Sequence, residues 1–269
     1  MTTWDPTQYA RFSGERTRPW HDLLAQVGAR DPRLVVDLGC GNGPATLELA
    51  QRWPDARVVG VDSSPEMLAA AREADAAGRV EWVEADLRDW DMASLGAAPD
   101  VVLTNAALQW VPGHLSILPR WVDGLAPGGW FGMQVPGNFD SPTHALMRET
   151  AVAHPRRAQL EAAAKRLGAG DPATYLQLLS APDRLVSAWE TTYLHVLDRE
   201  GEQDNPVLEW VRGTGLRPVL EILTDEAERD AFLADYGARL KAAYPRTGAG
   251  VILPFRRVFT VVHVPGTGV

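Results

Sequence analysis

The residues best suited to chemistry stand in a glycine-rich turn and at the end of the next strand. The range Val35–Gly43 reads VVDLGCGNG, a β-branched run that passes directly into glycines. Glycine lets a backbone adopt positive φ and approach a bound ligand closely, where larger side chains would block it. Nineteen residues after Gly43, Asp62 ends the next apolar run, where its carboxylate can bind the two hydroxyls of a ribose. The pattern therefore predicts a nucleotide-like ligand at the carboxyl ends of parallel strands.

The glycine spacing and the acid before it narrow the identity of this nucleotide. The dinucleotide fingerprint G-x-G-x-x-G/A requires a small residue five positions after its first glycine. Counted from Gly39 that position is Pro44, and counted from Gly41 it is Thr46, so the fingerprint fails from either start. Asp37 suits a cationic ligand better than a pyrophosphate, because opposite charges attract at short range. We therefore expect S-adenosylmethionine, with its sulfonium and ammonium groups, as the cofactor.

Residues after the later strands complete the candidate cofactor site. Asp86 can accept a hydrogen bond from the adenine amine, and Leu87 beside it can flank the ring. Asn105 and Gln109 lie in a loop that would face the methionine end of the cofactor. Cys40 fills space in the glycine turn, and we assign it no chemistry. The cofactor candidates in these segments are Asp37, Gly39, Cys40, Gly41, Asp62, Ser63, Met67, Asp86, Leu87, Asn105 and Gln109.

These residues need a scaffold, and the first half of the chain alternates β-branched runs with helical patterns. The expected strands are Leu34–Leu38, Arg57–Asp62, Val80–Glu84, Val101–Thr104 and Trp130–Val135, and the expected helices are Ala45–Arg52, Pro65–Ala77 and Leu115–Leu125. The chain then turns helical over 142–180 and 206–244, with two further strands near Ser187–Leu197 and Phe255–Val264. This order predicts an α/β fold with a seven-stranded, mostly parallel sheet and helices on both faces.

We expect one domain over residues 1–269. A helical N-terminal segment would span 1–30 and the cofactor-binding core 31–136, while the last strands would lie at 186–198 and 251–264. The helical insertions at 137–185 and 199–245 follow a core that is already complete, so we expect them to form a cap over the substrate.

Composition limits the location and the partners of the chain. With 35 acidic against 26 basic residues the net charge is −9, which argues against a phosphate backbone as the main partner. Cys40 is the only cysteine, so intrachain disulfides and a multi-cysteine zinc site are excluded. The start lacks a secretory pattern, and the longest uncharged stretch, Val101–Pro119, contains polar residues that a bilayer core would not accept. We expect a cytoplasmic protein without a metal, acting on a small molecule and not on nucleic acid or a membrane.

Further motifs run from the start of the chain to Arg257. They are Trp4-Asp5-Pro6-x-x-Tyr9-x-x-Phe12-x-x-Glu15-Arg16-x-Arg18-Pro19, Gln51-Arg52-Trp53-Pro54, Asp62-Ser63-Ser64-Pro65-x-Met67-Leu68, Leu108-Gln109-Trp110, Pro142-Thr143-His144-x-Leu146-Met147-Arg148-Glu149, Thr191-Thr192-Tyr193-x-His195 and Thr214-Gly215-Leu216-Arg217-Pro218. With these motifs the chain resembles the bacterial trans-aconitate 2-methyltransferases, a family of class I S-adenosylmethionine-dependent methyltransferases, over nearly its whole length. The resemblance implies a Rossmann-like sheet and formation of the monomethyl ester of trans-aconitate at its 2-position carboxylate. Phe139 and the segment His154–Asp171 depart from the family pattern.

A tricarboxylate substrate implies cationic groups that can hold carboxylates, and the planar guanidinium of arginine does so with two hydrogen bonds. All but two of the 26 basic residues are arginine. Arg16 can meet either the carboxylate of the cofactor or the substrate, and we place it with the cofactor candidates. Gln134 and His195 are secondary candidates for the substrate. The residues expected to bind the substrate are Arg18, Trp110, His144, Arg148, Tyr193, Arg217 and Arg257.

The implied reaction needs no catalytic base. A substrate carboxylate with a pKa of roughly 4 is ionised at neutral pH, so in-line attack on the methyl group requires no proton removal, and we expect no catalytic residue. One alternative is a methyltransferase of the same fold acting on another carboxylic acid, a carrier-bound acyl group or a ring carbon. Another is a protein that binds the cofactor without catalysis. A nucleic-acid methyltransferase is disfavoured, because the range Asn105–Leu108 lacks the Asp/Asn-Pro-Pro-aromatic motif used for a flipped base.

Overall fold

The computed structural model describes residues 13–164 and 169–266, and of residues 13–16 the backbone alone. The described residues form two compact units. The larger unit consists of residues 17–136, 169–191 and 257–266, and the smaller of residues 13–16, 137–164 and 192–256. The expected site motifs are therefore divided, and every cofactor candidate whose side chain is described lies in the larger unit.

One sheet runs through the larger unit, and its two longest strands continue into the smaller one. The strands are β1 (Leu34–Leu38), β2 (Arg57–Asp62), β3 (Val80–Glu84), β4 (Val101–Asn105), β5 (Trp130–Pro136), β6 (Leu185–Leu197), β7 (Arg246–Thr247) and β8 (Gly250–His263). They lie in the order β3-β2-β1-β4-β5-β8-β6, and the two-residue β7 pairs with β8. Strands β1 to β5 pair in parallel and β8 runs antiparallel to β5. The expected α/β fold is confirmed.

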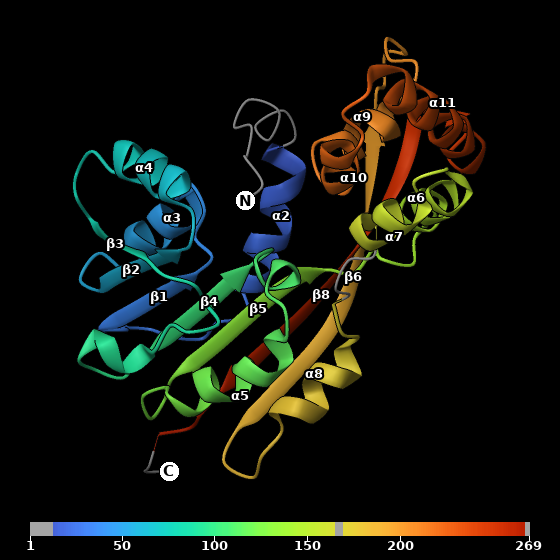
Figure 1. Cartoon of the computed structure of the whole chain (residues 1–269). Helices are drawn as coiled ribbons and strands as arrows, with labels where there is room; N and C mark the ends of the chain where they lie inside the picture. The colour runs from blue at the N-terminus through green and yellow to red at the C-terminus, as the bar shows by residue number, and fades with distance from the viewer. Residues whose placement is uncertain (1–12, 165–168, 267–269) are drawn as a thin grey trace. The chain divides into compact units, whose positions relative to one another are not determined.

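Helices cover both faces of the sheet in the larger unit. They are α2 (Ser13–Leu24), α3 (Pro44–Arg52), α4 (Pro65–Ala74), α5 (His114–Asp123) and α8 (Pro172–Leu179). Figure 1 shows α2, α3 and α4 on one face and α5 and α8 on the other. Because both faces are covered, the central strands are largely apolar, and all five residues of β1, the acid Asp37 included, are buried. On one face Val36, Val102 and Met133 pack in a core with Trp121 of α5.

The strand order places a ligand site in the larger unit. The chain runs from β1 through β2 to β3 and then returns to the other side of β1 with β4, so the strand order reverses between β1 and β4. Open α/β sheets bind ligands at such a switch point, just outside the carboxyl ends of the strands. The loops after β1 and β4 meet there, and they contain the cofactor candidates Gly39, Cys40, Gly41 and Gln109.

The smaller unit is mainly helical and has a core of its own. Its helices are α6 (Pro142–Ala153), α7 (Arg157–Ala164), α9 (Pro206–Arg212), α10 (Arg217–Ile222) and α11 (Glu226–Ala243). Met147, Leu216 and Tyr236 belong to one buried apolar cluster. The Tyr236 hydroxyl donates a hydrogen bond to the carbonyl of Thr143 at 2.8 Å, which joins α11 to α6.

The expected insertion at 137–185 is divided between the units. Residues 137–164 fold with the smaller unit, whereas α8 belongs to the larger one and packs against α5. A buried hydrogen bond of 3.0 Å joins His114 Nε2 to the Tyr175 hydroxyl across these two helices. Across the described chain, each helix is either too short or too polar to cross a bilayer.

Candidate active site

The glycine turn after β1 forms an open backbone surface. Gly39, Gly41 and Gly43 have φ values of +75°, +55° and +92°, a region that favours glycine because a Cβ atom there is strained. A Cβ atom on Gly39 would lie 2.2 Å from the Cβ atom of Ala107, so the turn packs closely against the loop after β4. A Cβ atom on Gly41 would meet nothing within 4 Å. The turn is therefore closed toward the loop after β4 at Gly39 and open to a ligand at Gly41.

Asp37 is a buried acid directly beneath this turn. Its carboxylate is 2% exposed and accepts a hydrogen bond of 2.6 Å from the hydroxyl of Thr46 on α3. Burial raises the pKa of Asp37 to about 6, against the opposing effect of the Thr46 hydrogen bond, and the nearby Asp62 raises it further. At neutral pH the site thus contains a desolvated negative charge, which favours a cation bound nearby.

Asp62 and the start of α4 form the second part of the site. One carboxylate oxygen of Asp62 accepts the Gly41 amide at 2.9 Å, and the other accepts the Ser64 amide at 2.9 Å. A carboxylate oxygen can accept more than one hydrogen bond, so Asp62 keeps capacity for ligand hydroxyls. Ser64 caps α4 by accepting the Met67 amide at 3.2 Å. The cap follows Asp62 directly in the chain, and of the two other candidates here Ser63 is exposed and Met67 is half-buried.

The loop after β3 shows a contact that the sequence did not predict. Arg88 binds the Asp86 carboxylate with its Nε atom 3.0 Å from both oxygens and its Nη2 atom 2.6 Å from one of them. These hydrogen bonds lower the pKa of Asp86. Leu87 is buried in the core beside it. The expected adenine contact of Asp86 would therefore share a carboxylate that Arg88 already orients.

The loop after β4 is strained and held by glutamines. Ala106 has a φ of +54°, which is unfavourable for a residue with a Cβ atom. Its amide donates to the Gln134 carbonyl at 2.9 Å, and its carbonyl accepts from the Gln109 side chain at 2.5 Å. The side-chain oxygens of Asn105 and Gln109 are buried and have no hydrogen-bond partner among the described residues. Strained backbone and unpartnered acceptors together are typical of a ligand-binding loop.

Three substrate candidates lie in the larger unit. Arg18 on α2 is largely exposed and lies 3.8 Å from Asp22. Trp110 is 41% exposed at the end of the loop after β4. Arg257 on β8 is buried, and its Nη1 atom donates to the Gln134 side chain at 3.4 Å. The side chains of Arg16 and of the motif from Trp4 to Glu15 lie outside what the structure describes.

Four substrate candidates lie in the smaller unit. Arg148 donates from Nη1 to the carbonyl of Phe139 at 2.6 Å and is partly exposed. The His144 Nδ1 atom lies 3.1 Å from the Thr143 hydroxyl. Tyr193 is buried, and Arg217 is half-buried at the first residue of α10. The secondary candidate His195 is buried and stacks on Trp210, as a core aromatic residue would.

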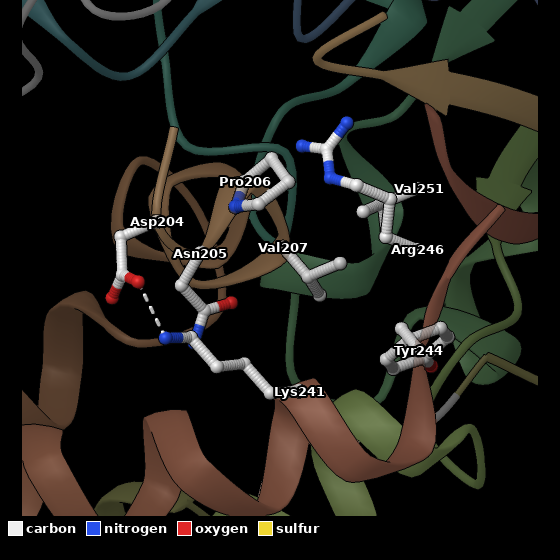
Figure 2. Close-up of a pocket in the computed structure, with 8 residues that line it drawn as sticks. All are labelled: Asp204, Asn205, Pro206, Val207, Lys241, Tyr244, Arg246 and Val251. Carbon is white, nitrogen blue, oxygen red and sulfur yellow. Dashed lines mark hydrogen bonds and ion pairs between the residues drawn. The ribbon is translucent and has the colours of Figure 1, made fainter. Parts of the chain in front are cut away.

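A charged pocket in the smaller unit is distinct from all of these candidates (Figure 2). Its two cations are paired, Lys241 with Asp204 at 2.6 Å and Arg246 with Asp198. None of the site residues expected from the sequence lines it. The residues that line it are Asp204, Asn205, Pro206, Val207, Lys241, Tyr244, Arg246 and Val251. With both cations paired, we assign this pocket no role in the reaction.

Two positions of the site were not singled out from the sequence. Thr46 orients Asp37 through a hydrogen bond. The sequence could have indicated this role, because Thr46 is a hydroxyl residue in the first turn of the helix that follows Asp37. Ala106 gave no signal, because its positive φ results from the pairing of the loop with β5.

Comparison with known proteins gives matches at the levels of family, sequence and fold. A family model described as a methyltransferase domain matches residues 35–129. A trans-aconitate 2-methyltransferase of Streptomyces avermitilis is 49% identical over 98% of this chain and 97% of that protein. Relatives from Azoarcus and Mycobacterium tuberculosis with the same name are 47% and 46% identical over 97% and 98% of the chain.

Two solved structures are similar in fold alone. The YcgJ protein of Bacillus subtilis has a TM-score of 0.60 at 12% identity, over 93% of this chain and 99% of that one. The plantazolicin methyltransferase BpumL, in complex with a triazolic desmethylPZN analogue and SAH, has a TM-score of 0.50 at 14% identity. That match covers 97% of this chain and 86% of BpumL.

Proposed function

The chain belongs to the trans-aconitate 2-methyltransferase family of class I methyltransferases, and we propose that it transfers a methyl group from S-adenosylmethionine to trans-aconitate. The observation that carries the proposal is identity of 46–49% over nearly the full length of the chain and of its relatives. The match therefore includes the helical segments outside the cofactor-binding core, where the substrate candidates Arg148 and Arg217 lie. A shared core alone would support methyl transfer but not the choice of acid.

The residues of the larger unit fit S-adenosylmethionine. The open turn at Gly41 lets backbone approach a ligand, and Asp62 beside it has acceptor capacity for ribose hydroxyls. The unpartnered side-chain oxygens of Asn105 and Gln109 match an ammonium group, which only donates hydrogen bonds. The buried Asp37 adds a negative charge that suits a cationic cofactor. When bound, S-adenosylmethionine supplies a methyl group activated by its sulfonium.

The chemistry is a displacement at the methyl carbon. A carboxylate oxygen forms a bond to this carbon while the bond from carbon to sulfur breaks, and the sulfur keeps the electron pair of that bond. The nucleophile is already ionised at neutral pH, because carboxylic acids of this kind have a pKa of roughly 4. The protein then contributes by orienting the two reactants and by excluding the water that would solvate the carboxylate. No residue has to act as a general base.

The substrate ligands and the cap are part of the proposal. Arg148, Arg217 and Arg257 are proposed to bind carboxylates, which suits the fixed charge and planar donors of arginine. The 2-position is taken from the names of the relatives, and we propose that the carboxylate there is esterified. The net charge of −9 supports a small-molecule substrate over nucleic acid, and a single cysteine is compatible with the proposed cytoplasmic location.

A methyl-transfer assay tests this function. The purified protein is incubated with methyl-labelled S-adenosylmethionine and, in turn, with trans-aconitate, cis-aconitate, isocitrate and citrate. We expect labelled ester from trans-aconitate at the highest kcat/KM of the four acids. Higher kcat/KM with another acid would reject trans-aconitate as substrate, and no product from any acid, despite cofactor binding, would favour a cofactor-binding protein without this activity.

A further inference from the structure

Gln134 on β5 has a buried side-chain amide whose nitrogen is not hydrogen-bonded by the residues that the structure describes. Its side chain is 1% exposed, in a strand whose neighbours Met133 and Val135 are buried apolar residues. Its Nε2 atom has no hydrogen-bond partner among the described residues. A buried amide without a partner is costly, so such groups are rare in folded proteins and need an explanation.

Arg257 fixes the direction of this amide. The Gln134 Oε1 atom accepts a hydrogen bond from Arg257 Nη1 at 3.4 Å. Because a guanidinium has donors only, the atom of Gln134 that faces it must be the oxygen. The amide NH₂ group consequently faces away from Arg257. A neutral donor and a buried cation thus lie together at this end of β5 and β8, which are adjacent strands (Figure 1).

The cross-strand neighbours of Gln134 place this donor beside the candidate cofactor loop. Gln134 lies in register with Asn105 on β4 and with Phe259 on β8. The main-chain carbonyl of Gln134 also accepts the amide of Ala106, in the loop that carries Gln109. One corner of the larger unit therefore combines two acceptors, Asn105 Oδ1 and Gln109 Oε1, with the amide donor of Gln134, and none of the three has a hydrogen-bond partner in residues 13–164 and 169–266.

This division of donors and acceptors matches two ligands of opposite charge. The acceptors suit the ammonium of the cofactor, as argued above, whereas an amide donor beside a guanidinium suits a carboxylate. We propose that Gln134, oriented by Arg257, donates a hydrogen bond to a carboxylate of the acid substrate next to the cofactor loop. The inference rests on the proposed function, and it makes Gln134 a residue that selects carboxylic acids over uncharged methyl acceptors.

Two substitutions separate this role from a structural one. Gln134→Leu removes the donor at similar size. Gln134→Glu keeps an oxygen for Arg257 and forms an ion pair with it, so a purely structural role would be preserved, while its negative charge would repel a bound carboxylate. The matched control is Thr260→Val. Thr260 is fully buried on β8 and its hydroxyl also lacks a partner among the described residues, but it pairs with Met133 and so lies on the opposite face of the sheet.

Calorimetry on the folded variants measures the dissociation constant of S-adenosylhomocysteine and that of trans-aconitate for the S-adenosylhomocysteine-loaded protein. For Gln134→Leu we expect trans-aconitate to bind about 10- to 100-fold more weakly, the range for a hydrogen bond to a charged group. Gln134→Glu should abolish binding of the acid. Both variants should bind S-adenosylhomocysteine within about 2-fold of wild type, since the amide NH₂ meets the acid and not the cofactor. Thr260→Val should change neither constant.

Other results would overturn the inference. Weaker binding of S-adenosylhomocysteine by Gln134→Leu would make Gln134 a cofactor ligand. Unchanged acid binding by Gln134→Glu would mean that water or Asn105 satisfies the amide. If the wild type binds and methylates a different carboxylic acid, the proposed substrate is wrong and the same variants are tested with that acid. A wild type that binds no carboxylic acid would overturn both proposals.

Discussion

The buried carboxylate of Asp37 allows the electrostatics of the cofactor site to be tested through stability. Asp37→Asn keeps the size of the side chain and an oxygen that can accept from Thr46, but removes the charge. Burial raises the pKa of Asp37 from its ordinary 3.8 to about 6. A difference of about two pH units corresponds to about 3 kcal/mol between the protonated and ionised forms.

The direction in which the free energy of unfolding changes with pH follows from which state, folded or unfolded, binds the Asp37 proton. Between pH 4 and pH 6 the folded protein retains the Asp37 proton, whereas the unfolded chain has lost it, so the free energy of unfolding falls as pH rises through this window. Above pH 6 Asp37 is ionised in both the folded and the unfolded state, so the free energy of unfolding falls no further from this cause. Asp37→Asn has no such dependence, and its stability relative to wild type should rise by about 3 kcal/mol between pH 4 and pH 8.

Urea denaturation of both proteins from pH 4 to pH 8 measures this difference. Calorimetry at pH 8 then compares S-adenosylmethionine with S-adenosylhomocysteine, which lacks the sulfonium charge. Asp37→Asn should weaken binding of the charged cofactor more than binding of its neutral product. The control is Asp100→Asn, since Asp100 accepts the Arg33 and Leu34 amides at the opposite end of β1. A stability difference that is flat with pH, together with an equal loss for both ligands, would refute the reasoning.

Three further outcomes are expected. Gly39→Ala should lower the melting temperature and weaken S-adenosylhomocysteine binding at least 10-fold, because its Cβ atom would meet Ala107 at 2.2 Å. The control Gly128→Ala has a similar φ but open space around the new Cβ atom, and it should leave binding unchanged. Equal effects of the two substitutions would count against a packed turn. Arg148→Ala and Arg217→Ala should each raise the KM for trans-aconitate about 10-fold or more and leave the KM for S-adenosylmethionine unchanged. Unaltered KM values for trans-aconitate would make these arginines structural. The profile of kcat from pH 6.5 to pH 9 should show no loss at low pH in wild type, since no base has to be deprotonated, and a steep rise through neutrality would indicate one.

The cofactor-binding core could be predicted because its signals are local. The strand, glycine turn and helix around Gly41, and the acid at Asp62, lie within one βαβ unit, and the structure places Asp62 against the Gly41 amide. The cap of α4 by Ser64 is a local feature as well, because Ser64 directly precedes the proline at the first helical position. Features that depend on distant partners were not predictable. The positive φ of Ala106 depends on its pairing with β5, and α8 folds with α5 through Tyr175.

Residue roles at the site were harder to predict than its position. Asp86 was expected from its place after a strand, but the sequence did not indicate that Arg88 binds its carboxylate. Gln134 was a secondary candidate because a single amide in an apolar strand can have many partners. The structure gives its side-chain oxygen one partner, Arg257, while its side-chain nitrogen has none within the part of the chain that is described. The cofactor and substrate roles of individual residues stay predictions for the binding experiments above.

The most direct test of the central claim is the structure of the product. The protein is incubated with trans-aconitate and S-adenosylmethionine labelled with carbon-13 in the methyl group, and the product is analysed by NMR. We predict one labelled methyl ester, with its methyl signal correlated to the carboxyl carbon at position 2. A labelled methyl group on carbon, on another carboxylate, or on no product at all would contradict it.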